Sequence, residues 1–177
     1  MPYLDTYTIP FKNLDQGKTH KYEFQVDDEF FKQFEYSEIK HGNLTVLVDL
    51  TVNPDNLVLD FTVKGEVEVQ CDRCLDYFMH PVDFQTRMYV RFAEFSTQWF
   101  DYDEEIYISR EETRINIAKH IYDFINLALP MKKVHPPDEN GNPTCDPLML
   151  EKLEELKPKH HEDEIDPRWS ALKDLLN

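Results

Sequence analysis

The sequence predicts an α+β fold in which an antiparallel β-sheet or meander is packed by one long helix, with short C-terminal helices and an irregular loop. Apolar residues alternate with polar ones along residues 44–52, 57–69 and 82–92, which is the period of a half-buried strand. Apolar residues then recur at helical spacing before Pro130. With 177 residues, 41% of them hydrophobic, the chain can bury the core that this fold requires.

The first elements lead into the meander. Loose alternation along residues 1–26 predicts one or two strands, interrupted by a turn at Gly17. Residues 27–34 begin with acidic side chains and bring three phenylalanines to one side, which is typical of a short helix. A turn at residues 53–56 joins the next two strands, and Gly65 indicates a bulge or bend in the second of them.

The long helix is expected to begin at residues 109–112, after a short strand at residues 105–108. The order Ser-Arg-Glu-Glu has the spacing of a capping box, and Pro130 would close the far end of the helix. The apolar stripe that should cover the sheet consists of Ile117, Ile121, Phe124, Ile125 and Ala128. We interpret this stripe as core rather than as a cofactor pocket, and His120 at its edge as a boundary residue.

A proline- and asparagine-rich loop follows the predicted long helix and ends at Cys145. Asp146 and Pro147 then have the order of an N-cap and a first helical position, so a short helix should follow them. We expect residues 1–130 to form the sheet-and-helix core, and residues 131–177 to form a loop and a helical extension of the same domain.

Two further segments offer side chains to a partner. Asp166 can cap a helix over residues 166–176, in which Arg168 is a bidentate donor and Trp169 is a large apolar ring. We expect this helix to dock either on its own domain or on a partner. Trp99 and Phe100 lie in an acidic and aromatic stretch and either contact a partner or pack back on the sheet.

Cys71 and Cys74 form a C-x2-C pair where one strand-like run ends and another soon begins. A tight turn with this spacing can aim two thiolates at one ion, whereas neighbouring side chains on a flat strand point to opposite faces. Because there is no second such pair, we expect Cys145 and His135, which share one loop, to complete a tetrahedral structural zinc site. Two alternatives are buried thiols without a metal and a redox pair, although redox C-x-x-C motifs normally open a helix.

The formal net charge is −16, from 35 acidic and 19 basic residues. Such a chain repels phosphate backbones and anionic lipid, so we expect no strong direct RNA binding and no membrane association. The same negative charge attracts basic partners, and ribosomal proteins are an abundant class of basic proteins. The odd number of cysteines and the lack of a leader-like start or a membrane-length apolar stretch indicate a cytoplasmic protein.

Three features in this order resemble the YceD family, whose members are bacterial and plastid proteins linked to the accumulation of large-subunit ribosomal RNA. They are Cys71-Asp-Arg-Cys74-Leu75 after a strand, Pro130 with His135 and Cys145 after the helix, and Asp166-Pro-Arg-Trp near the end. The resemblance implies a role in making or maintaining the large ribosomal subunit. Many relatives carry a second C-x2-C zinc ribbon where this chain has Cys145 alone, which leaves only the mixed set of donors.

The leading hypothesis is therefore a non-enzymatic factor in ribosome biogenesis, whose partner is a basic ribosomal protein or a large-subunit assembly intermediate. One alternative is a zinc-dependent enzyme in which Cys71, Cys74 and Cys145 hold the metal and a water while His135 acts otherwise. No further catalytic motif accompanies these residues. A third hypothesis is a generic acidic binding module that acts as a chaperone for a basic protein.

Overall fold

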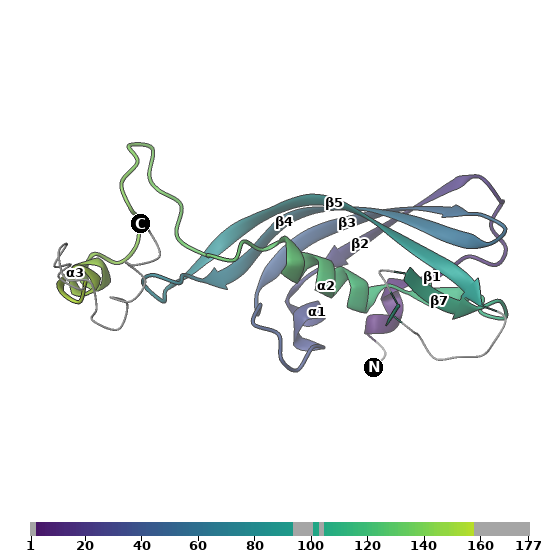
Figure 1. Cartoon of the computed structure of the whole chain (residues 1–177), viewed down its shortest axis with the longest axis horizontal. Helices are drawn as coiled ribbons and strands as arrows, with labels where there is room; N and C mark the ends of the chain where they lie inside the picture. The colour runs from purple at the N-terminus through teal and green to yellow at the C-terminus, as the bar shows by residue number, and fades with distance from the viewer. Residues whose placement is uncertain (1–2, 94–100, 103–104, 158–177) are drawn as a thin grey trace, which may run out of the picture.

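The computed structural model describes residues 3–93, 101–102 and 105–157. A curved six-stranded sheet, in the order β2-β3-β4-β5-β7-β6, holds helices α1 and α2 on its concave side (Figure 1). A two-stranded sheet, β1-β8, lies beside the N-terminal 3-10 helix Leu4–Tyr7. The strands are β1 Thr8–Pro10, β2 Thr19–Val26, β3 Gly42–Val52, β4 Asn56–Gln70, β5 Tyr77–Ala93, β6 Asp101–Tyr102, β7 Glu105–Ser109 and β8 Arg114–Asn116. The helices are α1 Asp28–Lys32, α2 Ala118–Ala128 and α3 Pro147–Glu155.

The meander from β2 to β5 is antiparallel, as the alternation of apolar residues predicts. Every second residue of β3 and of the first half of β4 is buried, and the residues between them face outward. α2 covers this buried face, where Phe124 meets Phe61 with ring centroids 5.2 Å apart. The ring of Tyr122 stacks on Phe34 at 4.0 Å. These contacts join the sheet and both helices into one apolar core.

Two fold predictions are wrong. The main sheet is mixed rather than antiparallel, because β7 pairs with β5 in parallel, with Val90 opposite Ile106. The helix is not long, since α2 has 11 residues and begins at Ala118. Ser109 ends β7, and its side chain accepts a hydrogen bond from the N–H of Glu111 in a turn, so the apparent capping box opens no helix.

The segment before α2 is a strand because of distant pairing. Ile115 in β8 lies opposite Ile9 in β1, and both side chains are fully buried. The true start of α2 is fixed by Asn116, whose side-chain oxygen accepts a hydrogen bond from the N–H of Ala118 at 3.0 Å. Of the predicted stripe, Ile117, Ile121 and Ile125 are buried and Phe124 packs partly buried against the core. Ala128, at the end of α2, is exposed, so the stripe stops one turn earlier than predicted.

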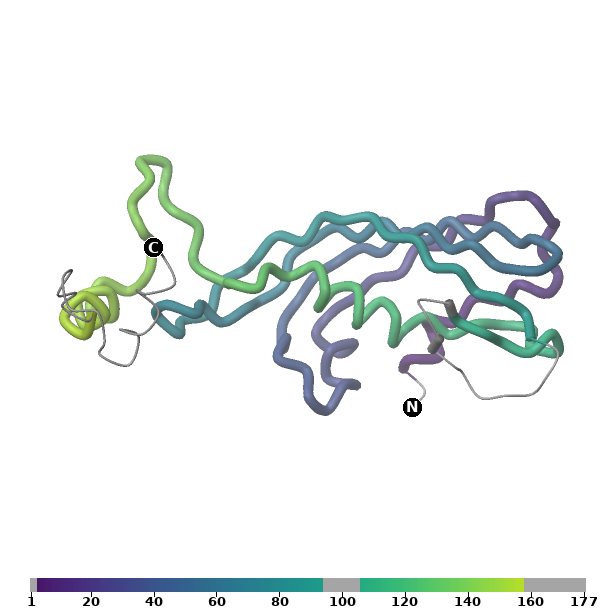
Figure 2. Tube along the Cα trace, in the orientation of Figure 1, coloured from purple at the N-terminus to yellow at the C-terminus, as the bar shows by residue number. Residues whose placement is uncertain are grey.

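The β4–β5 hairpin projects beyond the rest of the sheet and carries the cysteine turn at its tip (Figures 1 and 2). Pairing between β3 and β4 ends at Gly42 opposite Val67, whereas pairing between β4 and β5 continues to Gln70 opposite Tyr77. Gly65 lies just before this overhang with φ +149°, and a Cβ there would lie 2.2 Å from the carbonyl oxygen of Asn43. Only glycine fits this close approach, as expected for a bend.

Within the described part of the chain, no helix is both long and apolar enough to cross a bilayer. The division into a core of residues 1–130 and an extension of residues 131–177 stays a prediction.

Candidate metal centre

The turn at residues 71–76 closes the hairpin and turns both thiols to the same side. The N–H of Cys71 donates to the carbonyl of Asp76 at 2.8 Å, and the N–H of Leu75 donates to the carbonyl of Cys71 at 2.9 Å. Leu75 has φ +66°, so the chain reverses in the left-handed region directly after Cys74. A non-glycine residue in this conformation is uncommon and is held here by the surrounding turn.

The segment after α2 is attached to this turn through Asp72. The N–H of Asp72 donates to the carbonyl of Lys133 at 2.7 Å, and the N–H of Lys133 donates to the Asp72 carboxylate at 2.6 Å. The Lys133 ammonium also pairs with Glu38 at 3.5 Å. His135, two residues further on, is thereby brought beside the cysteines.

The loop between His135 and Cys145 closes on itself. The Asp138 carboxylate accepts hydrogen bonds from the N–H groups of Asn140 and Asn142 at 2.9 and 2.7 Å. Hydrogen bonds from the side chain and the backbone of Asn142 hold the pKa of Asp138 below its usual value. This closed loop brings the chain back to its starting point, so that the Cys145 thiol lies beside the His135 imidazole, ten positions earlier in the sequence.

Three of the distances between the four donor atoms are close to those of a tetrahedral zinc site. The Sγ atoms of Cys71 and Cys145 are 3.8 Å apart, and all four ligand atoms lie within 4.8 Å of one another. The Nδ1 atom of His135 lies 3.4 Å from the Sγ of Cys74 and 3.7 Å from that of Cys145. Tetrahedral zinc, with Zn–S of about 2.3 Å and Zn–N of about 2.05 Å, requires S–S distances of about 3.8 Å and S–N distances of about 3.6 Å. A disulfide would require about 2.05 Å between sulfurs, and the three cysteines are free.

The thiols are buried, with exposed fractions of 0%, 4% and 3% for Cys71, Cys74 and Cys145. The ring of Phe78 lies against that of His135 with centroids 4.6 Å apart. The remaining cover consists of the partly buried side chains Val134, Met149 and Leu150. Water is therefore largely excluded from the donors, which is the setting of a closed structural site.

Backbone N–H groups favour a thiolate at Cys71. Burial raises the pKa of this thiol, but hydrogen bonds from the N–H groups of Cys74, Arg73 and His135 outweigh burial and lower the pKa to about 6. Burial and the neighbouring thiol of Cys71 raise the pKa of Cys145. Negative charge at one thiol thus opposes ionisation of the next, and a bound divalent cation would remove that opposition.

The structure brings together all four residues that the sequence analysis proposed as metal donors. The proposed partner contacts Trp99, Phe100, Asp166, Arg168 and Trp169 lie outside the described residues. Sequence reasoning missed the roles of Asp72 and Asp138. The Asp-Glu-Asn-Gly-Asn run at residues 138–142 is a turn signal that could have identified the second of these.

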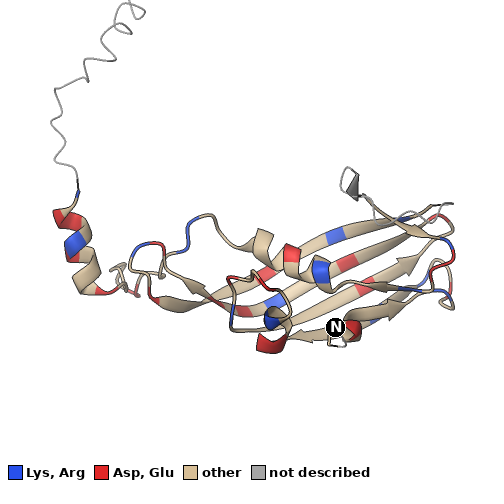
Figure 3. Ribbon diagram, turned by 90° about the horizontal axis from the view of Figure 1, so that it is seen from below, with Lys and Arg blue, Asp and Glu red and all other residues tan. Residues whose placement is uncertain are grey.

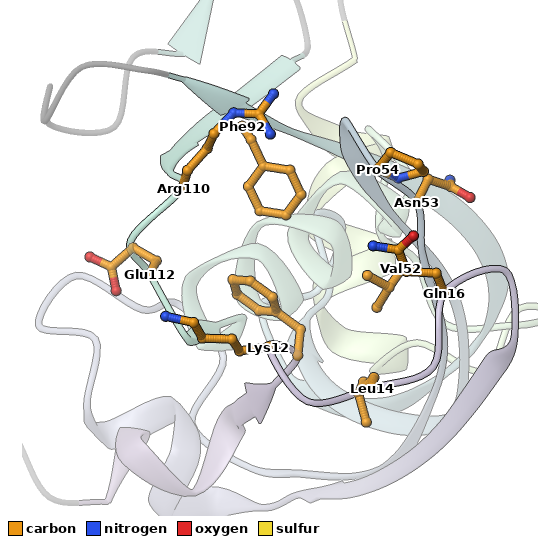
Figure 4. A pocket seen from close by; sticks show the side chains of 10 residues that line it. Lys12, Leu14, Gln16, Val52, Asn53, Pro54, Phe92, Arg110 and Glu112 are labelled. Carbon is orange, nitrogen blue, oxygen red and sulfur yellow. The ribbon is translucent and has the colours of Figure 1, made fainter.

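A hollow with a volume of about 170 Å³ lies at the opposite end of the sheet from the cysteine turn (Figure 4). Phe11, Phe92 and Val52 contribute apolar surface to it, and Arg110 lies at its rim. The Arg110 guanidinium is 6.0 Å from the Phe92 ring and is paired with Asp55 at 3.3 Å. This cation already has a carboxylate partner, so we assign the hollow no activity.

Comparison of the sequence with known proteins identifies a matching family and several relatives. A family model described as large ribosomal RNA subunit accumulation protein YceD matches residues 59–176. Uncharacterized proteins of Mycobacterium bovis and of two strains of Mycobacterium tuberculosis are each 29% identical to the chain over 136 residues, which is 73% of this chain. The chain spans about 62% of the length of these curated relatives. No solved structure matches the chain.

Proposed function

The chain belongs to the YceD family, and on this basis we propose that it is a non-enzymatic factor that supports the accumulation of large-subunit ribosomal RNA. The observation that carries the proposal is the extent of the family match. Residues 59–176 include the projecting hairpin, α2, all four candidate metal donors and the Asp-Pro-Arg-Trp segment. The proposed role would be exercised in the cytoplasm.

We further propose that Cys71, Cys74, His135 and Cys145 hold a structural zinc ion. Three of the donor distances fit tetrahedral zinc, and zinc prefers thiolate donors such as two from a hairpin turn with a third from a distant loop. Bound zinc would cross-link the tip of the β4–β5 hairpin to the segment before α3. Elemental analysis of protein purified without added metal tests this, with one zinc per chain expected.

The number of protein donors argues against the alternative of a zinc enzyme. A catalytic zinc keeps one position open for water or substrate. His135 would supply the fourth position here, since its Nδ1 lies 3.4 Å from the sulfur of Cys74 and 3.7 Å from that of Cys145. Four protein donors would leave no open position on a bound zinc ion, which favours a structural role.

The formal net charge of −16 supports a basic partner, such as a ribosomal protein alone or within a large-subunit assembly intermediate. Lys and Arg residues are interspersed with Asp and Glu over the described residues (Figure 3). On the outer face of the sheet, Lys21 lies 3.8 Å from Asp49, and Arg87 contacts both oxygens of Asp60. These cations are already paired, which disfavours their use on phosphates.

Deletion of the gene and complementation test the function. Large-subunit rRNA should fall relative to small-subunit rRNA in the deletion strain and recover with the wild-type gene. An unchanged ratio would contradict the proposal.

Isolation of the tagged protein at moderate salt tests the partner. A basic ribosomal protein or precursor large subunits should accompany it, whereas a different basic protein would indicate a generic chaperone. Isolated large-subunit rRNA should bind weakly at physiological salt, and tight binding that weakens steeply with salt would reveal a basic face.

A further inference from the structure

α3 carries an apolar stripe, of which only the first turn packs against the cysteine cluster. Met149 and Leu150, in its first turn, pack against the cysteine cluster. Leu153 and Leu156 follow on the same side at helical spacing but are 41% and 79% exposed. None of the residues of α3 is fully buried. Within the described part of the chain, the second half of the stripe is therefore uncovered.

The length of α3 makes this exposure costly. Helices shorter than about 12 residues are marginal in water, because most helical stability in proteins comes from packing an apolar face. α3 has nine residues, and its cap at Asp146, which accepts from the N–H of Leu148 at 3.0 Å, supports only its first turn. A second apolar surface over Leu153 and Leu156 would supply the missing packing.

The sequence that follows predicts such a surface, preceded by a linker of suitable length. Residues 158–165 are polar apart from Pro158 and Ile165, and eight extended residues span about 27 Å. α3 is about 14 Å long at 1.5 Å per residue, so the linker can return along its whole length. The next segment places Trp169, Leu172 and Leu176 at i, i+3 and i+7, which is one helical stripe.

We propose that residues 166–176 dock on the Leu153 and Leu156 side of α3. The linker places this segment at millimolar effective concentration, which favours it over a separate molecule. Arg168 adds a cation that suits the acidic residues of α3, Glu151, Glu154 and Glu155. The proposal rests neither on bound zinc nor on a role in rRNA accumulation.

Fluorescence of Trp169 tests the docking in the full-length protein. The chain has two tryptophans, so Trp99→Phe leaves Trp169 as the only indole emitter. This variant should show blue-shifted emission and slow quenching by acrylamide. Adding Leu153→Glu and Leu156→Glu should shift the emission to the red and increase the quenching constant several-fold. The matched control is Leu127→Glu, at an 80% exposed position on α2, which should change neither quantity.

Three results would overturn the proposal. The first is red-shifted emission from a solvent-exposed Trp169 in the Trp99→Phe protein. The second is blue-shifted emission that does not change when Leu153→Glu and Leu156→Glu are added. The third is blue-shifted emission that is lost when the protein is diluted. The last would assign the surface to a second copy of the chain. Hydrogen exchange provides a check that does not alter α3, because Trp169→Ala should accelerate exchange of the α3 amides while β3 and β4 stay protected. Unchanged α3 exchange would contradict docking.

Discussion

The sheet core and the tip of the β4–β5 hairpin are stabilised in different ways. The core buries apolar side chains from both sheets and from α1 and α2, many of them with no exposed surface. At the tip the buried residues are three cysteines, covered by side chains that are only partly buried. Apolar burial can stabilise the first region, whereas the second buries little apolar surface, and there the proposed zinc would act as a cross-link. Damage to the tip should therefore leave the core folded, whereas damage to the core should also unfold the tip.

Ile121→Ala should have the largest effect, because it removes a fully buried side chain from the contact between α2 and the sheet. We expect a loss of about 2–5 kcal/mol in the free energy of unfolding. Both regions should unfold together, since the tip is built on strands of the core. Chemical denaturation followed by circular dichroism measures this, with Leu127→Ala as an exposed control on the same helix. A loss below about 1 kcal/mol would show that α2 is not integral to the core.

Cys71→Ser should abolish zinc binding but leave the sheet folded. Removing one of four donors leaves an incomplete set, and the loop of residues 136–145 and α3 would lose their cross-link. Hydrogen exchange should rise throughout residues 133–157 and stay low in β3 and the first half of β4. His80→Asn is a suitable control, because His80 lies near Phe78 on the same hairpin and is not one of the four donors. Global unfolding of the serine variant would refute the separation of the two regions.

Leu75→Gly should have a smaller and opposite effect. Leucine in the left-handed region costs about 1–2 kcal/mol, part of which is offset by the greater freedom of glycine in the unfolded chain. We expect a gain of at most about 1 kcal/mol, confined to the tip and seen as slower zinc loss to a chelator. Faster loss would mean that the exposed Leu75 side chain contributes packing that outweighs its backbone strain.

The exposed pair of His41 and Asp28 should give the smallest effect, a weak pH dependence of the core. A hydrogen bond of 2.8 Å raises the pKa of His41 above 6.5, and the same bond lowers the pKa of Asp28 below 3.8. The His41 contribution is complete below pH 6.5 and is lost as the pH rises through its folded pKa. The Asp28 contribution is lost as the pH falls through its own folded pKa. His41→Gln should flatten this dependence in thermal melts taken from pH 4 to 8, and an unaltered profile would contradict the assignment.

Local patterns predicted much of the fold, and distant pairing caused the errors. The alternation in β3 and β4 is a property of the strands themselves, so it is readable in the sequence. The strand β8 was mistaken for helix because Ile117 continues a helical stripe, while the pairing of Ile115 with Ile9 is invisible locally. The parallel pairing of β5 with β7 is likewise non-local.

The candidate donors were predictable because their chemistry limits the choice. Three cysteines, two of them in one turn, leave few ways to build a tetrahedral set, and His135 shares a loop with the third. The means of bringing them together could not be predicted. It depends on the two hydrogen bonds between Asp72 and Lys133, which join residues 61 positions apart.

The sequence separation of the cysteines sets an order of events during folding. Cys71 and Cys145 are 74 positions apart, and β5, β7 and α2 lie between them. Closing so long a loop before the intervening chain is compact carries a large entropic penalty. The donors therefore cannot nucleate folding. During synthesis from the N-terminus, the sheet and α2 are complete before Cys145 emerges. Capture of the proposed zinc ion would then follow folding of the core, so that zinc binding would report a core that is already complete.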